Sequence, residues 1–404
     1  MAERADDSLR WILQRTAKAA LAGALCAAGA RWAVNVWRRR LAGGGRVILL
    51  SYHRVTLDFR GDAQQSLASL LISAETLKIQ LEQLARERDL VSLEDACRLL
   101  AERPPRRQAR DAVAVTFDDG YQGCHDFGLP VLQALHAPAT MFVPTGYLGT
   151  EHRLPHDRIY AALSELWRRG RRPREAELAP APQAALDRCA GPGPATTLER
   201  LIAGEPHDVL LAVADALEAR LGLREEDLEP GTRLMGWEEA RALDAAGVRI
   251  GGHTVNHAVL ANLPQARARA EIEGSHRQIE ERLGHPPLHF AYPNGYHTPA
   301  VRRMVAEAGY LAAVTTEDLE NRRGGDPFAL RRKVLWENST LGAAGYSRAL
   351  AACNLDGVFG AMGLQPPVLG ERPDGAEEAP DAVEDPGDAA ALEDAPGEEG
   401  RAVS

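Results

Sequence analysis

The chain has 404 residues, which is too long for one small domain and fits one large α/β domain with additional segments. Apolar residues make up 45% of it, an ordinary share for a globular protein with a sizeable core. The five cysteines are odd in number and scattered, with no CxxC pair, which argues against a disulfide framework or a zinc-ribbon site. The net charge of −10 arises in the C-terminal segment, where twelve acids stand against two arginines from Glu371 to Arg401. The rest of the chain is nearly neutral and has no basic surface of the kind that binds nucleic acid.

Residues 1–45 are a helical leader with basic residues and apolar residues at helical spacing. Its uncharged stretch, Ala19–Ala30, falls short of the roughly 20 residues that a membrane-spanning helix needs. Three interpretations stay open: a basic amphipathic helix that contacts a membrane surface through residues 9–40, a signal peptide cleaved after Ala28-Gly29-Ala30, or a helix packed on the domain. The sequence therefore gives no localisation beyond membrane-associated or exported.

After the leader, short apolar runs alternate with helical patterns. The runs are expected strands buried on both faces: Val47–Tyr52, Val113–Phe117, Ala139–Val143, Val248–Ile250, Leu288–Tyr292, Leu311–Thr315 and Lys333–Trp336. The expected helices are one capped by Ser73, one capped by Ser92, and those over Ala266–Leu283 and Ala300–Ala308. This alternation over about 290 residues predicts a parallel β/α barrel.

Two segments break the alternation. Residues 150–232 contain helical segments around a Pro/Ala-rich piece, Pro173–Pro194, and we interpret them as an insertion after a barrel strand. Residues 366–404 have almost no large apolar side chain and are expected to be a disordered acidic tail.

Polar motifs follow four of the expected strands. Asp118 and Asp119 close one strand, and two adjacent carboxylates there are costly to bury without a cation. His253 and His257 follow another, with the i, i+4 spacing that puts two imidazoles on one helical face within reach of one metal. His53 ends the first strand and is a candidate proton donor.

The fourth motif is Tyr292-Pro293-Asn294, whose Pro shapes a tight loop with backbone amides that could face the site. Each motif alone has an ordinary alternative, namely a turn or a histidine satisfied in the core. Together, however, they all lie at strand carboxyl ends, the face where barrel enzymes hold their active sites. Asp119, His253 and His257 form a facial set that suits one divalent metal, zinc first, with cobalt, nickel or iron as alternatives.

The motifs TFDDG, HTVNH and AYPNG, in this order, resemble the polysaccharide deacetylase family, also called the NodB homology domain or carbohydrate esterase family 4. The resemblance covers about residues 46–340, within a domain that we place at 46–345. It implies a distorted (β/α)7 barrel and metal-dependent hydrolysis of N-acetyl groups on a hexosamine glycan. By motif position, Asp118 would be the general base and Asp119, His253 and His257 the metal ligands; an oxyanion would be held near Asn294.

Two departures from the family pattern stand out. Ala291 occupies the position of a family arginine, which Arg331 or Arg332 could replace from another strand. No histidine follows His297, so the family's usual late acid is missing. The poly-N-acetylglucosamine deacetylase branch resembles this chain more, because it carries the acid in an early Tyr-His motif, which His53 matches. Two alternatives stay open: a catalytically silent glycan-binding protein of the same fold, or an amidase on a small substrate other than a sugar.

Overall fold

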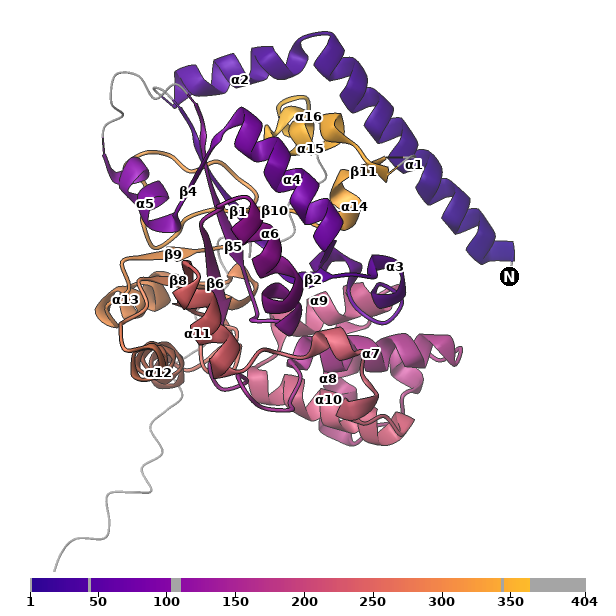
Figure 1. The fold of residues 1–404 in the computed structure, drawn as a ribbon. Helices are drawn as coiled ribbons and strands as arrows, with labels where there is room; N and C mark the ends of the chain where they lie inside the picture. Colours follow the sequence, from indigo (N-terminus) through magenta and orange to yellow (C-terminus); the bar gives the residue numbers. More distant parts are fainter. Residues whose placement is uncertain (1, 43–44, 103–109, 343–344, 364–404) are drawn as a thin grey trace, which may run out of the picture.

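The structure is a computed structural model that describes residues 2–42, 45–102, 110–342 and 345–363. The expected acidic tail at 366–404 lies outside these residues. The core of the fold is an eight-stranded parallel sheet, drawn at the centre of Figure 1. Its strands are β1 (Val47–Tyr52), β4 (Asp89–Val91), β5 (Ala112–Phe117), β6 (Ala139–Val143), β7 (Val248–Gly252), β8 (His289–Ala291), β9 (Ala312–Val314) and β10 (Lys333–Val334).

Seven of these strands follow one another in the order β10-β1-β5-β6-β7-β8-β9, and β4 pairs with the first half of β5. All seven match the predicted runs, because strands covered on both faces need continuous apolar sequence. Within the described residues, β9 and β10 share no ladder; the segment that precedes β10 meets β9 through a bridge between Val314 and Leu330. This incomplete closure gives the predicted distorted (β/α)7 barrel.

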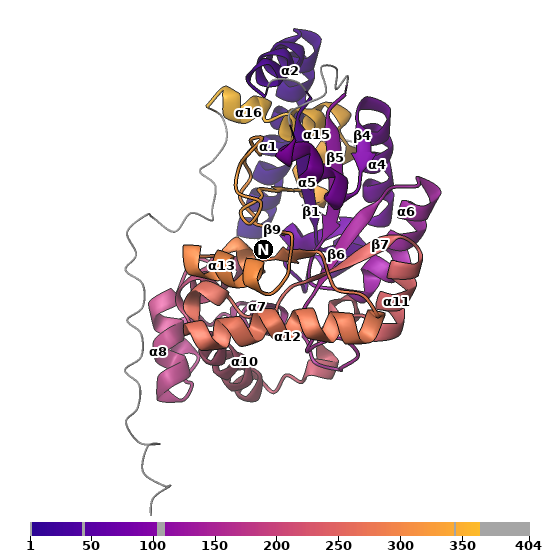
Figure 2. The same cartoon turned by 90° about the vertical axis from the view of Figure 1, so that its left-hand side faces the viewer.

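Helices cover the outside of the sheet (Figures 1 and 2). They are α4 (Ala74–Glu87), α5 (Leu93–Ala101), α6 (Leu129–Ala134), α11 (Trp237–Ala245), α12 (Gln265–Leu283) and α13 (Pro299–Glu307). Both predicted caps are present: the Ser73 hydroxyl accepts from the Thr76 amide at 3.1 Å, and Ser92 accepts from the Asp95 amide at 3.0 Å. A short helix, α3 (Phe59–Asp62), lies between β2 (Arg54–Thr56) and β3 (Leu71–Ser73).

The segment between β6 and β7 contains the predicted helical insertion: α7 (Pro155–Arg168), α8 (Pro180–Cys189), α9 (Pro194–Gly204) and α10 (His207–Leu221). These helices bury an apolar cluster of their own. The Pro/Ala-rich piece contributes α8, since Pro180 stands in the first turn, where its missing N–H costs nothing. Figure 1 shows the insertion as a layer at the carboxyl ends of the strands.

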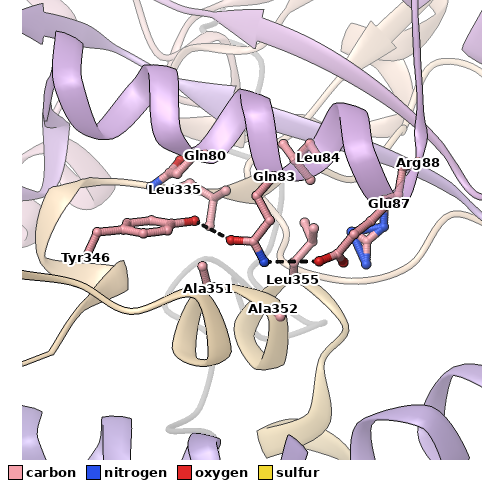
Figure 3. Close-up of a pocket in the computed structure, with 10 residues that line it drawn as sticks. All are labelled: Gln80, Gln83, Leu84, Glu87, Arg88, Leu335, Tyr346, Ala351, Ala352 and Leu355. Atoms are coloured by element: carbon pink, nitrogen blue, oxygen red, sulfur yellow. Dashed lines mark hydrogen bonds between the residues drawn. The ribbon is translucent and has the colours of Figure 1, made fainter.

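The chain ends its described part in α14 (Glu337–Thr340), the hairpin β11 (Leu341–Gly342) and β12 (Gly345–Tyr346), and the helices α15 (Arg348–Leu355) and α16 (Val358–Ala361). These elements pack on α4 and extend the domain beyond residue 345. Figure 3 shows a pocket between α4 and α15, where the Tyr346 hydroxyl donates to the Gln83 side chain at 2.9 Å.

Residues 2–41 form two helices, α1 (Ala2–Ala27) and α2 (Ala30–Leu41), which lie against α15 and α16 (Figure 1). The chain breaks between them at Gly29, whose φ of 76° is left-handed. Within the described residues both helices pack on the domain, and membrane contact through residues 9–40 stays a prediction. No single described helix has the length and apolarity of a membrane span; Leu13–Ala27 and Ala30–Leu41 meet that test together, but with a bend of 70°.

Candidate active site

The paired carboxylates lie where β5 ends, and both are 2% exposed. Asp119 adopts a left-handed backbone conformation with φ 72°, and Gly120 follows it with φ 70°. A left-handed turn directly after the strand lets the two neighbouring side chains point to different partners. Asp118 meets an arginine, and Asp119 meets two histidines.

Arg332, one of the two arginines considered for the charge missing at Ala291, lies immediately before β10 and faces Asp118. Its guanidinium donates two hydrogen bonds, of 2.7 and 2.6 Å, to the Asp118 carboxylate, and Arg332 is fully buried. Its remaining Nε–H donates to the Thr315 carbonyl at 2.9 Å. Burial opposes the charge of Asp118, but Arg332 outweighs it and holds the pKa of Asp118 below its ordinary value. The other candidate, Arg331, pairs instead with Glu317.

Asp119, His253 and His257 converge from two strand ends. The Nε2 atoms of His253 and His257 lie 3.4 and 3.1 Å from Asp119 Oδ1. One ligand atom from each residue lies within 4.8 Å of the others, and all three residues are buried. The structure thus brings together the three residues that the sequence singles out as metal ligands.

The two histidines do not lie on a helix, and this expectation is wrong. After β7 the chain is an irregular loop in which Thr254 and His257 have φ of 64° and 54°. A left-handed β-branched residue is strained, so the surroundings must impose this shape. The Glu271 carboxylate does so from α12, because it accepts from the amides of Val255 and Asn256 at 2.9 and 2.8 Å.

The entry to this loop is equally constrained. A Cβ at Gly252, directly before His253, would stand 2.1 Å from the Tyr310 hydroxyl. That hydroxyl lies 3.1 Å from Ser275 on α12, so the two side chains together close the space behind the loop. Only glycine fits there, which explains the Gly-His pair at the end of β7.

Asp119, His253 and His257 suit a divalent metal by their protonation as well as by their spacing. His253 Nδ1 lies 2.7 Å from the Ala291 carbonyl, a partner that would hold the proton on Nδ1 and leave the Nε2 lone pair to an ion bound between His253 and Asp119. Burial lowers the pKa of His257 to about 4, which keeps its imidazole neutral near pH 7. Burial works against the charge of Asp119, yet the two histidines hold its pKa well below the ordinary value. One carboxylate and two neutral imidazoles are typical zinc ligands.

The Tyr292-Pro293-Asn294 motif lies next to the metal-ligand residues, because the Ala291 carbonyl that contacts His253 directly precedes it. Tyr292 is fully buried: its amide donates to Val314 O at 3.2 Å and its hydroxyl to Phe328 O at 2.9 Å. Those two groups are therefore engaged in the fold. Pro293 is buried, and Asn294 is left-handed with φ 58°. The loop shape that Pro293 and Asn294 impose leaves the Asn294 amide as the candidate oxyanion donor.

His53 lies near the proposed base. Its Nε2 is 3.8 Å from Asp118 Oδ2, and its side chain is 14% exposed. The imidazole and the carboxylate therefore face the same part of the site, as expected for residues that end the neighbouring strands β1 and β5.

A buried polar group from the insertion completes the site, and the sequence analysis missed it. The Tyr121 hydroxyl lies 2.8 Å from His156 Nε2 and donates to Asp157 Oδ2 at 2.9 Å. The His156 ring stands 5.1 Å from that of His257. Burial raises the pKa of Asp157 to about 7. The signal in the sequence was weak, since His156 and Asp157 open a helix rather than follow a strand. None of these residues, nor any metal-ligand candidate, lines the pocket of Figure 3.

Several solved structures resemble this one. A Streptococcus pyogenes deacetylase, PplD, in complex with acetate is 16% identical and superposes with a TM-score of 0.48 over 74% of this chain and 95% of its own. IcaB from Ammonifex degensii is 20% identical, with a TM-score of 0.48 over 77% and 98%. A de-N-acetylase from Aggregatibacter actinomycetemcomitans is 17% identical, with a TM-score of 0.46 over 73% and 96%.

Sequence comparison gives one short match and one long one. The Bacillus subtilis (strain 168) protein YlxY is 29% identical over 96 residues, which span 24% of this chain and 30% of that protein. The family model described as polysaccharide deacetylase matches residues 106–313, slightly more than half of the chain. That segment contains Asp118, Asp119, His253 and His257. The chain therefore belongs to the polysaccharide deacetylase family.

Proposed function

We propose that this deacetylase is metal-dependent and removes N-acetyl groups from a hexosamine-containing polysaccharide. The observation that carries the proposal is the juxtaposition of Asp118, charged and paired with Arg332, and the buried set Asp119, His253 and His257. Asp119, His253 and His257 would hold one divalent ion, with zinc the first candidate. When bound, such an ion supplies Lewis acidity toward the acetyl carbonyl and lowers the pKa of water.

Asp118 takes the proton from the attacking water. Its carboxylate is buried and stays charged because Arg332 is charged at every relevant pH, so the base is available well below neutral pH. The backbone amide of Asn294 is the proposed hydrogen-bond donor to the oxyanion, the oxygen that becomes negative in the tetrahedral intermediate. The contact between the Ala291 carbonyl and His253 fixes the position of this loop relative to the metal-ligand residues.

His53 is the proposed acid that protonates the leaving nitrogen. Without that proton the tetrahedral intermediate returns to substrate. His53 stands beside Asp118 rather than across from it, so the substrate would lie against both groups, with the nitrogen on the side of His53. The early Tyr-His position resembles the poly-N-acetylglucosamine branch, and this resemblance supports a polymer of N-acetylglucosamine as the substrate class.

Two measurements on one preparation test the proposal: bound metal, and acetate released from chitooligosaccharides with and without chelator. Release that the chelator abolishes and zinc or cobalt restores supports it. Binding of the oligosaccharide with no release would favour the silent glycan-binding alternative. Release from small N-acetylated amines but not from the oligosaccharides would favour the small-amide alternative.

A further inference from the structure

The N-terminal helix pair turns its cations toward the protein. On α1, the Arg15 side chain donates to the carbonyls of Leu341 and Gly342 at 3.3 and 3.2 Å. On α2, Arg31 binds the buried carboxylate of Asp356 at 2.7 Å. Charged groups that usually keep a surface helix in water are here used to attach it to the domain.

Two more arginines of α2 do the same. Arg38 donates to the Gly357 carbonyl at 3.1 Å, and Arg39 lies 3.0 Å from Asp111. Asp356 also accepts from Asn35 at 2.9 Å, so α2 is fixed by several partners along one side. These contacts, with the burial of Ala22 on α1, fix which side of each helix faces the domain and therefore which side faces away from it.

Large apolar side chains are exposed away from the domain on both helices. Leu13, Leu21, Trp32, Trp37 and Leu41 are 60, 41, 71, 54 and 70% exposed, and they are five of the nine large apolar side chains that stand out as exposed among the described residues. On α1 the exposed residues between Leu13 and Leu21 are Gln14, Thr16, Ala17, Lys18 and Ala20. A helix that faces water shows the reverse pattern, with apolar groups inside and charges outside.

The charge of the segment identifies the partner. From Ser8 to Leu57 the chain has no aspartate or glutamate; of the seven lysines and arginines at 10–40, four attach the helices to the domain, while Lys18 and Arg40 are exposed. Tryptophan with an apolar face and basic residues around it is typical of a helix that lies in a lipid interface, and anionic headgroups attract such a segment. A second protein copy would have to bury this positive charge against itself.

The shape agrees. The pair bends by 70°, and one side of each helix is held against the domain, so it fits lying in the interface rather than crossing it. Figure 1 shows α2 at the end of the barrel where β1 begins, while the candidate site lies where the strands end. We propose that the outer face of α1 and α2, formed by Leu13, Leu21, Trp32, Trp37 and Leu41, docks this enzyme onto a membrane that contains anionic lipid, with the active site left open to a glycan.

Vesicle flotation of the full chain tests this proposal, with vesicles of phosphatidylcholine alone and of phosphatidylcholine mixed with phosphatidylglycerol. We expect binding to the mixed vesicles, weakened by salt. The W32Q/W37Q double variant should bind about tenfold or more weakly, because each buried aromatic contributes a large part of the partition energy. The matched control is L311Q. It removes a large apolar side chain of similar exposure (59%) directly before β9, outside α1 and α2, and this variant should bind as the wild type does.

Three outcomes would overturn the proposal. The first is that the wild type floats with neither vesicle, and the second is that W32Q/W37Q binds like the wild type. The third is a wild-type dimer in solution that W32Q/W37Q converts to a monomer, which would assign the face to a second copy. Acetate release from soluble oligosaccharides should be the same in all variants. Failure of docking is therefore distinguishable from failure of the proposed chemistry.

Discussion

The two oxygens of Asp118 are held by the two terminal nitrogens of Arg332 at 2.7 and 2.6 Å, although the residues are 214 positions apart in the chain. The pair joins the end of β5 to the start of β10 across β1. Both Arg332 and His53 lie outside the segment that matches the family model, yet both approach the same carboxylate. The surroundings of the proposed base therefore include two residues from outside the matched segment.

Replacement of Arg332 should raise the pKa of Asp118, because burial then acts without the compensating cation. In Arg332→Met the acid limb of kcat/KM should move to higher pH, and Arg332→Lys should give an intermediate shift, since lysine keeps the charge but not the bidentate geometry. Arg331→Met, which breaks only the contact with Glu317, is the control and should leave the profile in place. An unmoved acid limb in Arg332→Met would show that another group limits the rate at low pH.

Asp118→Asn should keep the metal and lose acetate release by about 10²–10⁴-fold, the usual contribution of general base catalysis. The change also leaves Arg332 buried without an anion, so stability must be measured by melting alongside metal content. The double variant Asp118→Asn/Arg332→Met removes that unpaired charge. If it regains stability but not activity, the loss is chemical; near-normal turnover in either variant would place the base elsewhere.

Metal should stabilise the protein through Asp119, His253 and His257. Zinc at about 100 times its dissociation constant adds about 2.7 kcal/mol to the free energy of unfolding. We expect chelator to lower the melting temperature of the wild type and zinc to restore it, and His257→Ala to show neither effect. His125→Ala is the matched control, because His125 pairs with Asp126 at the surface. A zinc response in His257→Ala equal to that of the wild type would contradict the ligand assignment.

His53→Ala should reduce amide hydrolysis more than hydrolysis of aryl acetates, whose leaving group needs no proton. His156→Ala provides the comparison, since His156 is the other imidazole close to the metal-ligand set. Acetate release from amide and ester substrates, measured together with metal content, shows which of His53 and His156 protonates the leaving nitrogen. If the amide-selective loss appears in His156→Ala and not in His53→Ala, the acid comes from the insertion.

Stability should fall with acid because of His289, which begins β8. Burial lowers the pKa of His289 to about 4 from its ordinary 6.5, so below pH 6.5 the unfolded chain binds a proton that the folded chain excludes. The contribution is complete above pH 6.5 and is lost as pH falls toward 4, by up to about 3 kcal/mol. Denaturant unfolding from pH 7 to 4 should show a shallower decline for His289→Gln than for the wild type. Parallel curves would mean that His289 does not titrate on unfolding.

The sequence predicted the barrel strands well because burial on both faces demands continuous apolar runs. It missed β4, whose three residues are partly exposed and carry no such run. It also placed His253 and His257 on a helix, since i, i+4 spacing alone does not distinguish a helix from a loop that Glu271 holds in a left-handed shape.

The choice between Arg331 and Arg332 illustrates a second limit. Neighbouring residues of an extended segment point to opposite sides, so one of the pair had to face the barrel and the other solvent. Which one faces inward depends on the pairing of β10 with β1, where Leu50 stands opposite Lys333. His156 was missed for a related reason, because its contact with the site comes from how the insertion folds back and not from any local pattern.

The position of Arg332 has a consequence for how the enzyme is made. Ribosomes deliver it 75 residues after His257, about 4–15 s later at roughly 5–20 residues per second. A nascent chain can thus present all three metal ligands before its proposed base has the cation that keeps it charged. The proposed base therefore gains its cation only when the last barrel strand is in place, so the pH range of the activity is set by the completed domain.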